Sequence, residues 1–309
     1  PVEELVDDFA TVRVLDGWDR DVPRFRDPVA PCTVRHLATH TSGIVYPTWN
    51  AAQLHYLRTT GGIPTVTGKL SSLQSFPMLF DPGTRWAYGP STDWLGRVVE
   101  AVTGLEIDAY LDREILGPLA MPSSGVELDD DIAPRRLAAH LRTGDGFSVV
   151  DMDLPAHPEF YGMGHAMHAT AGDYARFCRM ILREGELDGA RVLRSETVAA
   201  MSTGAVGVER QETVQPHLAG DIDLFPEIPV THTVGFFRTE RDLDGRRRAG
   251  SLYWAGLLNT HYWIDPAAGI AAVVMMQHVP FLDDAATATL AAFERAVYAT
   301  TGSSATGPG

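Results

Sequence analysis

The sequence predicts an α+β fold in which a mainly helical part precedes an antiparallel sheet and a closing helix. Two observations support this class. In the middle of the chain apolar residues recur at helical spacing, for example Val98 and Val102 on one side of residues 93–103. In the last third, short runs rich in β-branched and aromatic residues follow one another before the amphipathic segment 283–299. We therefore expect an antiparallel sheet flanked by helices, joined to a mainly helical subdomain.

The chain is long enough for one large domain with a sizeable core, since 45% of its 309 residues are apolar. We expect a single domain over residues 1–309, with a mainly helical subdomain over 32–200 and a sheet-and-helix part over 201–300. Residues 301–309, rich in Gly and Ser, are expected to form a flexible tail. Residues 1–31 show little periodicity and predict an extended connector with short local turns.

Short hydroxyl-bearing residues mark the starts of several predicted helices. Thr33 is expected to cap a short helix that ends before Gly43. Ser91 or Thr92 is expected to cap the next long helix, and Ser195 a later one that ends near residue 201. Between them the stretch from about residue 117 to residue 165 is predicted to be loop-rich. The remaining predicted helices cover residues 50–60, 93–103, 106–116, 173–182 and 283–299.

The predicted sheet is a meander of neighbouring strands. A Pro-Ala-Ala-Gly turn at residues 266–269 separates the last two strands, and tight turns of this kind join antiparallel neighbours. The predicted strands cover residues 232–238, 248–254, 258–265 and 270–277.

Composition excludes several classes of partner. The formal net charge of -15 opposes binding to a phosphate backbone, and the one basic cluster, residues 246–248, lies at a predicted hairpin tip. No run approaches the roughly 20 apolar residues that span a bilayer, so no membrane partner is expected. Two cysteines, Cys32 and Cys178, cannot form a disulfide framework. The compartment and the oligomeric state stay open.

A group of histidines in the loop-rich stretch could suggest zinc. His165 and His168 are three residues apart, with His157 and Asp153 nearby, but the His-Glu-x-x-His pattern is absent. We therefore predict neither a metal nor an organic cofactor.

Five segments in a fixed order carry a family resemblance. They are residues 33–43 (TVRHLATHTSG), 82–96, 171–177 (AGDYARF), 187–193 (LDGARVL) and 254–266. Together they resemble the penicillin-recognising serine hydrolases: class C β-lactamases, family VIII carboxylesterases and D-Ala-D-Ala-peptidase relatives. The esterase branch is the most similar, because Trp254-Ala255-Gly256 matches its Trp-Gly-Gly element. The resemblance implies the β-lactamase/transpeptidase-like fold.

The resemblance implies a catalytic role for Tyr88. This residue matches the tyrosine of the family's Tyr-x-Asn element, which acts as general base and then as acid toward the leaving group. A phenol with an unperturbed pKa of about 10 can do this near neutral pH only beside a cation. The third position of the element is Pro90 instead of Asn, a departure that favours ester over β-lactam or peptide substrates. The alternative is that Tyr88 is an aromatic packing residue at a turn.

The resemblance also implies an oxyanion strand. Trp254, Ala255 and Gly256 are expected on an edge strand that lines the cleft, and the amide of Leu257 aligns with an oxyanion donor. Trp254 could instead be a core residue. Tyr46 and Trp49 would fall at the cleft rim, where substrate contact and surface packing are both open.

The nucleophile of the family is absent from this sequence. The family needs a Ser-x-x-Lys motif, but the one lysine, Lys69, has Val66 three residues before it. In relatives the motif lies upstream of the segment that aligns with Pro1, so we expect an N-terminally truncated chain that is inactive alone. Neither Ser42 nor Ser91 lies in a Gly-x-Ser-x-Gly elbow.

The expected function is that of a serine carboxylesterase. It would cleave small esters through an acyl-serine intermediate, with possible weak turnover of β-lactams or amides, so its partner is a small ester or amide. Two alternatives remain: a non-catalytic member of the fold that binds a ligand, and an acyltransferase on the same scaffold.

Overall fold

The computed structural model describes residues 1–144 and 146–302 and shows the expected α+β class. Within these residues the main sheet has six antiparallel strands in the order β12-β11-β10-β9-β8-β7, so the predicted meander is present. The strands are β7 (Val206–Gly207), β8 (Val230–His232), β9 (Phe237–Thr239), β10 (Leu252–Ala255), β11 (His261–Asp265) and β12 (Ile270–Val274).

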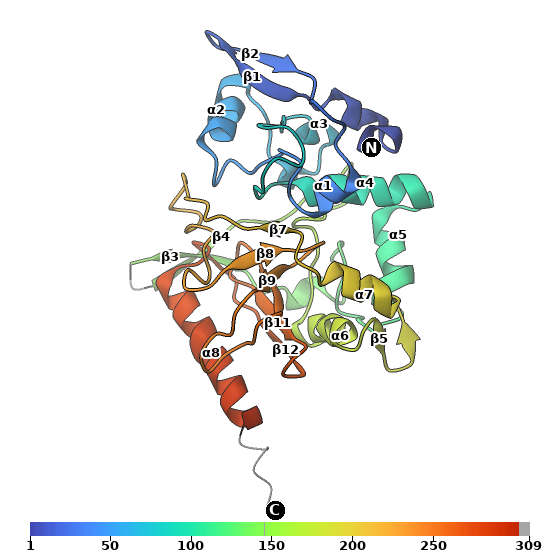
Figure 1. The fold of residues 1–309 in the computed structure, drawn as a ribbon, viewed down its shortest axis with the longest axis vertical. Coiled ribbons are helices and arrows are strands. Elements are labelled where there is room, and N and C mark those ends of the chain that lie inside the picture. The colour runs from blue at the N-terminus through green and yellow to red at the C-terminus, as the bar shows by residue number, and fades with distance from the viewer. Residues whose placement is uncertain (145, 303–309) are drawn as a thin grey trace, which may run out of the picture.

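The main sheet packs between α6 (Ala171–Leu182) and α8 (Asp284–Gly302) because successive residues of its strands point to opposite faces. Leu252 and Ile264 pack with the α6 side, whereas Tyr253 and Trp263 pack with the α8 side. All of β11 is buried. The N-terminal hairpin and the first helices after it lie toward the other end of the molecule from α8 (Figure 1).

One predicted strand is wrong. Residues 232–238 form two strands, β8 and β9, with a turn between them. The Thr233 amide donates to the Phe236 carbonyl at 2.7 Å, and Gly235 has a φ of 104°, which favours glycine. The turn could not be recognised in the sequence because apolar and β-branched residues, which are typical of strands, surround it.

Most predicted helices of the helical part are confirmed, with errors at their caps. Thr33 caps α1 in a capping box with His36, as expected for Thr33. Ser91 and Ser195 are instead the first residues of their helices and make no capping hydrogen bond. The helices are α1 (Val34–Ala38), α2 (Ala51–Thr60), α3 (Leu70–Leu73), α4 (Ser91–Thr103), α5 (Ile107–Leu111) with a π-helical turn (Asp112–Leu116), and α7 (Ser195–Met201). A 3-10 turn (Thr65–Thr67) and the two-residue strands β5 (Glu186–Leu187) and β6 (Ala190–Arg191) complete this part.

The predicted connector at the start of the chain is also wrong, because it is folded. Two 3-10 turns, Val2–Glu4 and Asp7–Thr11, bury Val2 and Phe9 in the core that also contains Cys32. They precede a hairpin of β1 (Val14–Asp19) and β2 (Val22–Arg26).

The loop-rich stretch contains a hairpin that the sequence analysis missed. It consists of β3 (Ala139–Thr143) and β4 (Gly146–Val150), and β3 also pairs in parallel with β13 (His278–Val279). A 3-10 turn, Ala133–Arg135, precedes it.

The C-terminal helix is tied to the sheet by a buried ion pair. Arg247 Nε lies 2.7 Å from Glu294 Oε1, and both side chains are at most 1% exposed. α8 extends to Gly302, two residues into the predicted tail, and the remainder of that tail lies outside the described residues. None of the described helices combines the length and the apolar character needed to cross a bilayer.

Candidate active site

Tyr88 lies in an extended segment just before α4, held by the backbone on both sides. The Ala87 amide donates to the His40 carbonyl at 2.9 Å, and the Tyr46 amide donates to the Tyr88 carbonyl at 3.0 Å. The next residue, Gly89, lies so close to the neighbouring chain that a Cβ would be 2.1 Å from the Ile44 carbonyl oxygen. Glycine is therefore required where the Tyr88 segment crosses residues 44–46.

Tyr88 and Trp254 are in direct contact. Their ring centroids lie 5.2 Å apart with an interplanar angle of 62°, the edge-on geometry that aromatic pairs favour. The tyrosine of the helical part and the tryptophan of the sheet therefore meet on the same side of the molecule.

The predicted edge position of Trp254 and Ala255 needs correction. β10 is an interior strand of the described sheet, between β9 and β11. However, β9 pairs only with Leu252 and Tyr253, so Trp254 and Ala255 have a strand partner only on β11. The short β9 leaves the second half of β10 open on the side away from β11.

The open side of β10 determines which backbone amides can donate a hydrogen bond to a ligand. The Gly256 amide donates to the Thr260 carbonyl of the β10–β11 connection at 2.7 Å. Because amide directions alternate along a strand, the Ala255 amide points away from β11. The Leu257 amide, next in the turn, donates no hydrogen bond within the described part of the chain. Leu257 therefore has a donor available for a ligand oxygen.

Tyr46 and Trp49 both contact Tyr88. The ring centroids of Tyr46 and Trp49 lie 5.1 and 5.6 Å from that of Tyr88, and Trp49 Nε1 donates to the Gly220 carbonyl at 2.9 Å. The Tyr88 amide donates to Gln211 Oε1 at 3.3 Å. Residues of the long β7–β8 connection thus bind the Trp49 side chain and the Tyr88 main chain.

Burial keeps the Tyr88 phenol protonated at neutral pH. It raises the pKa of Tyr88, and the nearby Asp93 carboxylate raises it further, while a hydrogen bond with the Trp254 side chain opposes both effects. Burial also raises the pKa of Asp93, whose Oδ1 accepts from the Gly164 amide at 2.8 Å. No lysine or arginine among the described residues stabilises the Tyr88 phenolate.

Two histidines near Tyr88 were not identified as site residues from the sequence. His40 and His232 are 4% and 1% exposed, and both rings contact Trp254. His40 directly precedes the recognisable Thr41-Ser42-Gly43 turn, and this is the one sequence signal that could have identified it as a site residue. For His232 the sequence offers none.

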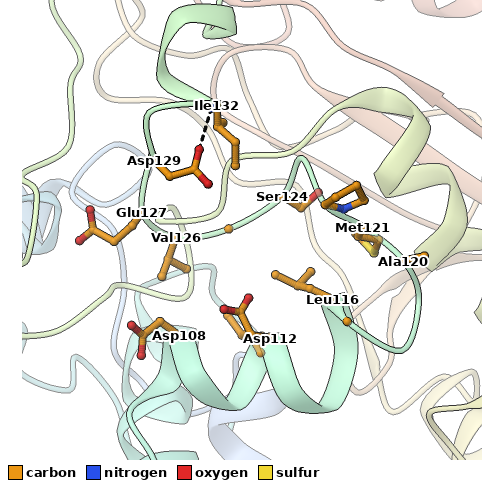
Figure 2. A pocket seen from close by; sticks show the side chains of 14 residues that line it. Asp108, Asp112, Leu116, Ala120, Met121, Ser124, Val126, Glu127, Asp129 and Ile132 are labelled. Carbon is orange, nitrogen blue, oxygen red and sulfur yellow. Dashed lines mark hydrogen bonds between the residues drawn. The ribbon is translucent and has the colours of Figure 1, made fainter.

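The pocket in Figure 2 lies elsewhere, between α5 and the loop after the π-helical turn, and has a volume of about 540 Å³. Asp108 and Asp112 on its helical side face Glu127 and Asp129 on the loop. Glu127 accepts from the Tyr161 hydroxyl and the His157 amide, and Asp129 accepts from two amides of its own loop. These two carboxylates therefore serve the fold, and the pocket includes none of the predicted site residues.

The histidines that could suggest zinc are dispersed. His165 Nδ1 lies 4.0 Å from Asp93, whereas His157 pairs with Glu127. Among the described residues, no group of three or more His, Cys, Asp or Glu side chains is placed to hold a metal ion.

Comparison with known proteins identifies the family. The family model described as Beta-lactamase matches residues 13–296, which is most of the chain. The chain belongs to the β-lactamase family. This β-lactamase-family protein is 29% identical over 321 residues to monacolin J acid methylbutanoyltransferase of Aspergillus terreus, covering 96% of this chain and 75% of the relative. It is 28% identical over 297 residues to lovastatin esterase of Penicillium rubens, covering 90% and 72%.

Solved structures agree with the family and the fold. A mutant of simvastatin synthase from Aspergillus terreus superimposes with a TM-score of 0.81 at 28% identity, over 98% of this chain and 76% of that one. The predicted β-lactamase/transpeptidase-like fold is therefore confirmed, and the protein is a member of a serine hydrolase family.

Proposed function

We propose that this β-lactamase-family protein acts on small carboxylic esters by acyl transfer through an acyl-serine, as a carboxylesterase. The observation that supports this most directly is the contact of Tyr88 with Trp254 at the open end of β10, three residues before Leu257 and its available amide. A group that transfers a proton and an amide that stabilises an oxyanion are what an acyl-transfer site requires.

In the proposed reaction Tyr88 acts as a phenolate, so the serine oxygen attacks the ester carbonyl carbon while the serine proton passes to the phenolate oxygen. The Leu257 amide stabilises the oxyanion that forms. Tyr88 then returns the proton to the departing alcohol, which leaves the acyl group on the serine. Because burial and Asp93 raise the pKa of Tyr88, a nearby cation is needed for the phenol to lose its own proton to solvent and become the phenolate, and the lysine of a Ser-x-x-Lys motif would supply that charge.

Two aromatic side chains are proposed to contact the substrate. Tyr46 and Trp49 lie against Tyr88 and provide an apolar surface for the acyl or alcohol part of a small ester. This assignment favours esters with short aliphatic or aromatic groups, without fixing the acyl length.

An acyltransferase is the second candidate. The names of the Aspergillus terreus relative and the Penicillium rubens relative describe a methylbutanoyl transfer and an ester hydrolysis, and both reactions pass an acyl group to an oxygen acceptor. In both, the last step releases the acyl group to water or to an alcohol. Adding an alcohol acceptor to the assay and measuring the ratio of transfer to hydrolysis separates the two candidates.

The proposed function is tested by supplying the nucleophile. The 309-residue chain and a fusion that joins a family member's Ser-x-x-Lys segment ahead of Pro1 are assayed with short-chain nitrophenyl esters. We expect turnover by the fusion and an acyl adduct on its serine by mass spectrometry. A folded fusion that binds an ester analogue without turnover would instead support the non-catalytic alternative.

Replacing Tyr88 by Phe in the fusion tests the proton transfer. We expect kcat to fall by about 10² to 10⁴, the usual contribution of a general acid–base group. Thermal unfolding should change little, since the ring contacts with Trp254 and Tyr46 remain. Tyr110→Phe, in another part of the core, is the matched control. An unchanged kcat in Tyr88→Phe would remove Tyr88 from the mechanism.

A further inference from the structure

His40 has an unusual backbone conformation for a buried side chain. Its φ is 51°, in the left-handed region, and its side chain is 4% exposed. This region is less favourable for residues with a Cβ than for glycine. The conformation belongs to the turn that ends α1: the Thr41 amide donates to the His36 carbonyl at 2.9 Å, and the His40 amide donates to the Leu37 carbonyl at 3.2 Å.

The His40 ring touches three aromatic side chains around the candidate site. Its centroid lies 5.0 Å from Tyr88 in an edge-on contact and 6.0 Å from Trp254 in a stacked contact with an interplanar angle of 6°. His232 meets the His40 ring at 5.2 Å and 88°. The imidazole therefore touches both members of the Tyr88–Trp254 pair.

The His40 main chain holds the same segment. Its carbonyl accepts from the Ala87 amide, the residue before Tyr88, at 2.9 Å. Main chain and side chain of one residue thus fix the position and the ring orientation of Tyr88. The left-handed φ of His40 is that of the residue after the C-cap of α1, so these contacts are made directly at the end of that helix.

His40 does not supply the cation that Tyr88 lacks. Burial and the neighbouring His232 lower the pKa of His40 well below its ordinary value, so the ring is neutral at pH 7. The other titratable groups near this contact are His232 from β8, Tyr46 after α1, and Asp93 from α4. The role left to His40 is geometric.

We propose that His40 is a positioning residue, whose imidazole holds the Tyr88 ring against Trp254 in the geometry that acyl transfer needs. This inference rests on the proposed function of Tyr88. Removing the ring while keeping the backbone conformation should let Tyr88 rotate and let water reach its hydroxyl.

His40→Asn is the variant of choice, since asparagine tolerates the left-handed region. In the 309-residue chain, the ¹³Cζ signal of Tyr88 is followed by NMR from about pH 8 to about pH 11, a range that brackets the ordinary phenol pKa of about 10. We expect no ionisation of Tyr88 in the unmodified chain and its onset within this range in His40→Asn. A folded His40→Asn whose Tyr88 remains un-ionised overturns the inference.

Two controls keep the test decisive. His217→Asn, at an exposed loop position, should leave the Tyr88 signal unchanged. In the unmodified chain, nuclear Overhauser contacts between the ring protons of His40 and Tyr88 are expected, and their absence contradicts the inference even if His40→Asn does not fold.

Kinetic measurements test the role of His40 separately from the proposed function. In the Ser-x-x-Lys fusion, His40→Asn should lower kcat about tenfold or more and leave KM within about twofold, because a displaced general acid–base group affects the chemical step. An inactive fusion would contradict the proposed function, while the titration of Tyr88 would still decide the role of His40.

Discussion

Burial determines the charge of the histidines around the candidate site. Burial lowers the pKa of His232 and of His261 to about 4. The Nδ1 atoms of both rings have no hydrogen-bond partner among the described residues. A neutral imidazole is tolerated in such surroundings, whereas an imidazolium is not.

This burial predicts a loss of stability in acid. The unfolded chain binds protons at these histidines near pH 6.5, but the folded chain binds them only near pH 4. Stability is therefore complete above about pH 6.5 and is lost as the pH falls toward 4, by on the order of 3 kcal/mol for each ring. The raised pKa of Asp93 acts in the opposite direction. Urea unfolding at several pH values measures the net slope.

His232→Gln should flatten that slope relative to the unmodified chain, whatever its effect on stability at neutral pH. His217→Gln, an exposed position, is the matched control and should keep the original slope. Equal slopes in all three proteins would show that His232 is not desolvated.

Individual site residues could be predicted from the sequence only where they lie in a recognisable motif. Tyr88 and Trp254 could be identified because each lies in a recognisable string of residues, and the structure brings them together. Their catalytic roles remain predictions. His232 and Asp93 could not be identified, because their importance comes from burial and from neighbours that are distant in sequence.

At the scale of structural elements, the closest approach of two backbone segments near the site is the crossing of the Tyr88 segment over residues 44–46. A Cβ on Gly89 would lie 2.5 Å from the Val45 Cα and closer still to the Ile44 oxygen. Both are backbone atoms, so side-chain rotation cannot relieve the clash.

We expect Gly89→Ala to lower the free energy of unfolding by about 1–3 kcal/mol, the usual cost of overpacking. It should also reduce turnover by the Ser-x-x-Lys fusion, since relief of the clash moves Tyr88. Gly207→Ala in β7 is the matched control, because no described atom lies within 4 Å of its Cβ position. Denaturant midpoints of the two variants make the comparison, and similar midpoints would argue against a close crossing.

Element boundaries were predictable where the signal is local. Thr33 and the left-handed Gly104 mark the ends of α1 and α4 through hydrogen bonds to neighbouring residues. The β1–β2 hairpin was missed because Arg20, and not glycine, adopts the positive φ of its turn. The open half of β10 depends on the length of β9, which no residue of β10 reveals.

For the molecule as a whole, the junction of α8 with the sheet contains one buried ion pair beside its apolar packing. The Arg247 guanidinium pairs with Glu294 and lies over the rings of Phe225, Tyr253 and Trp263 at 4.7, 5.0 and 5.0 Å. Both charges are removed from water, so each depends on the other.

Glu294→Gln should therefore destabilise the protein by about 3–5 kcal/mol, because it leaves the Arg247 charge buried without its partner. The double variant Arg247→Met with Glu294→Leu should recover most of that loss. Both are measured by urea unfolding at neutral pH. Equal losses in the single and double variants would mean that packing, and not charge, holds α8.

The parallel pairing of β3 with β13 joins the middle of the chain to a segment just before α8. Such a pairing closes a very long loop, and the entropy of that closure is lost before the contact contributes. During synthesis β3 can pair with β13 only after residues 278–279 have left the ribosome. We therefore expect β3 amides to gain protection from hydrogen exchange later than those of the local hairpin β10–β11 during refolding.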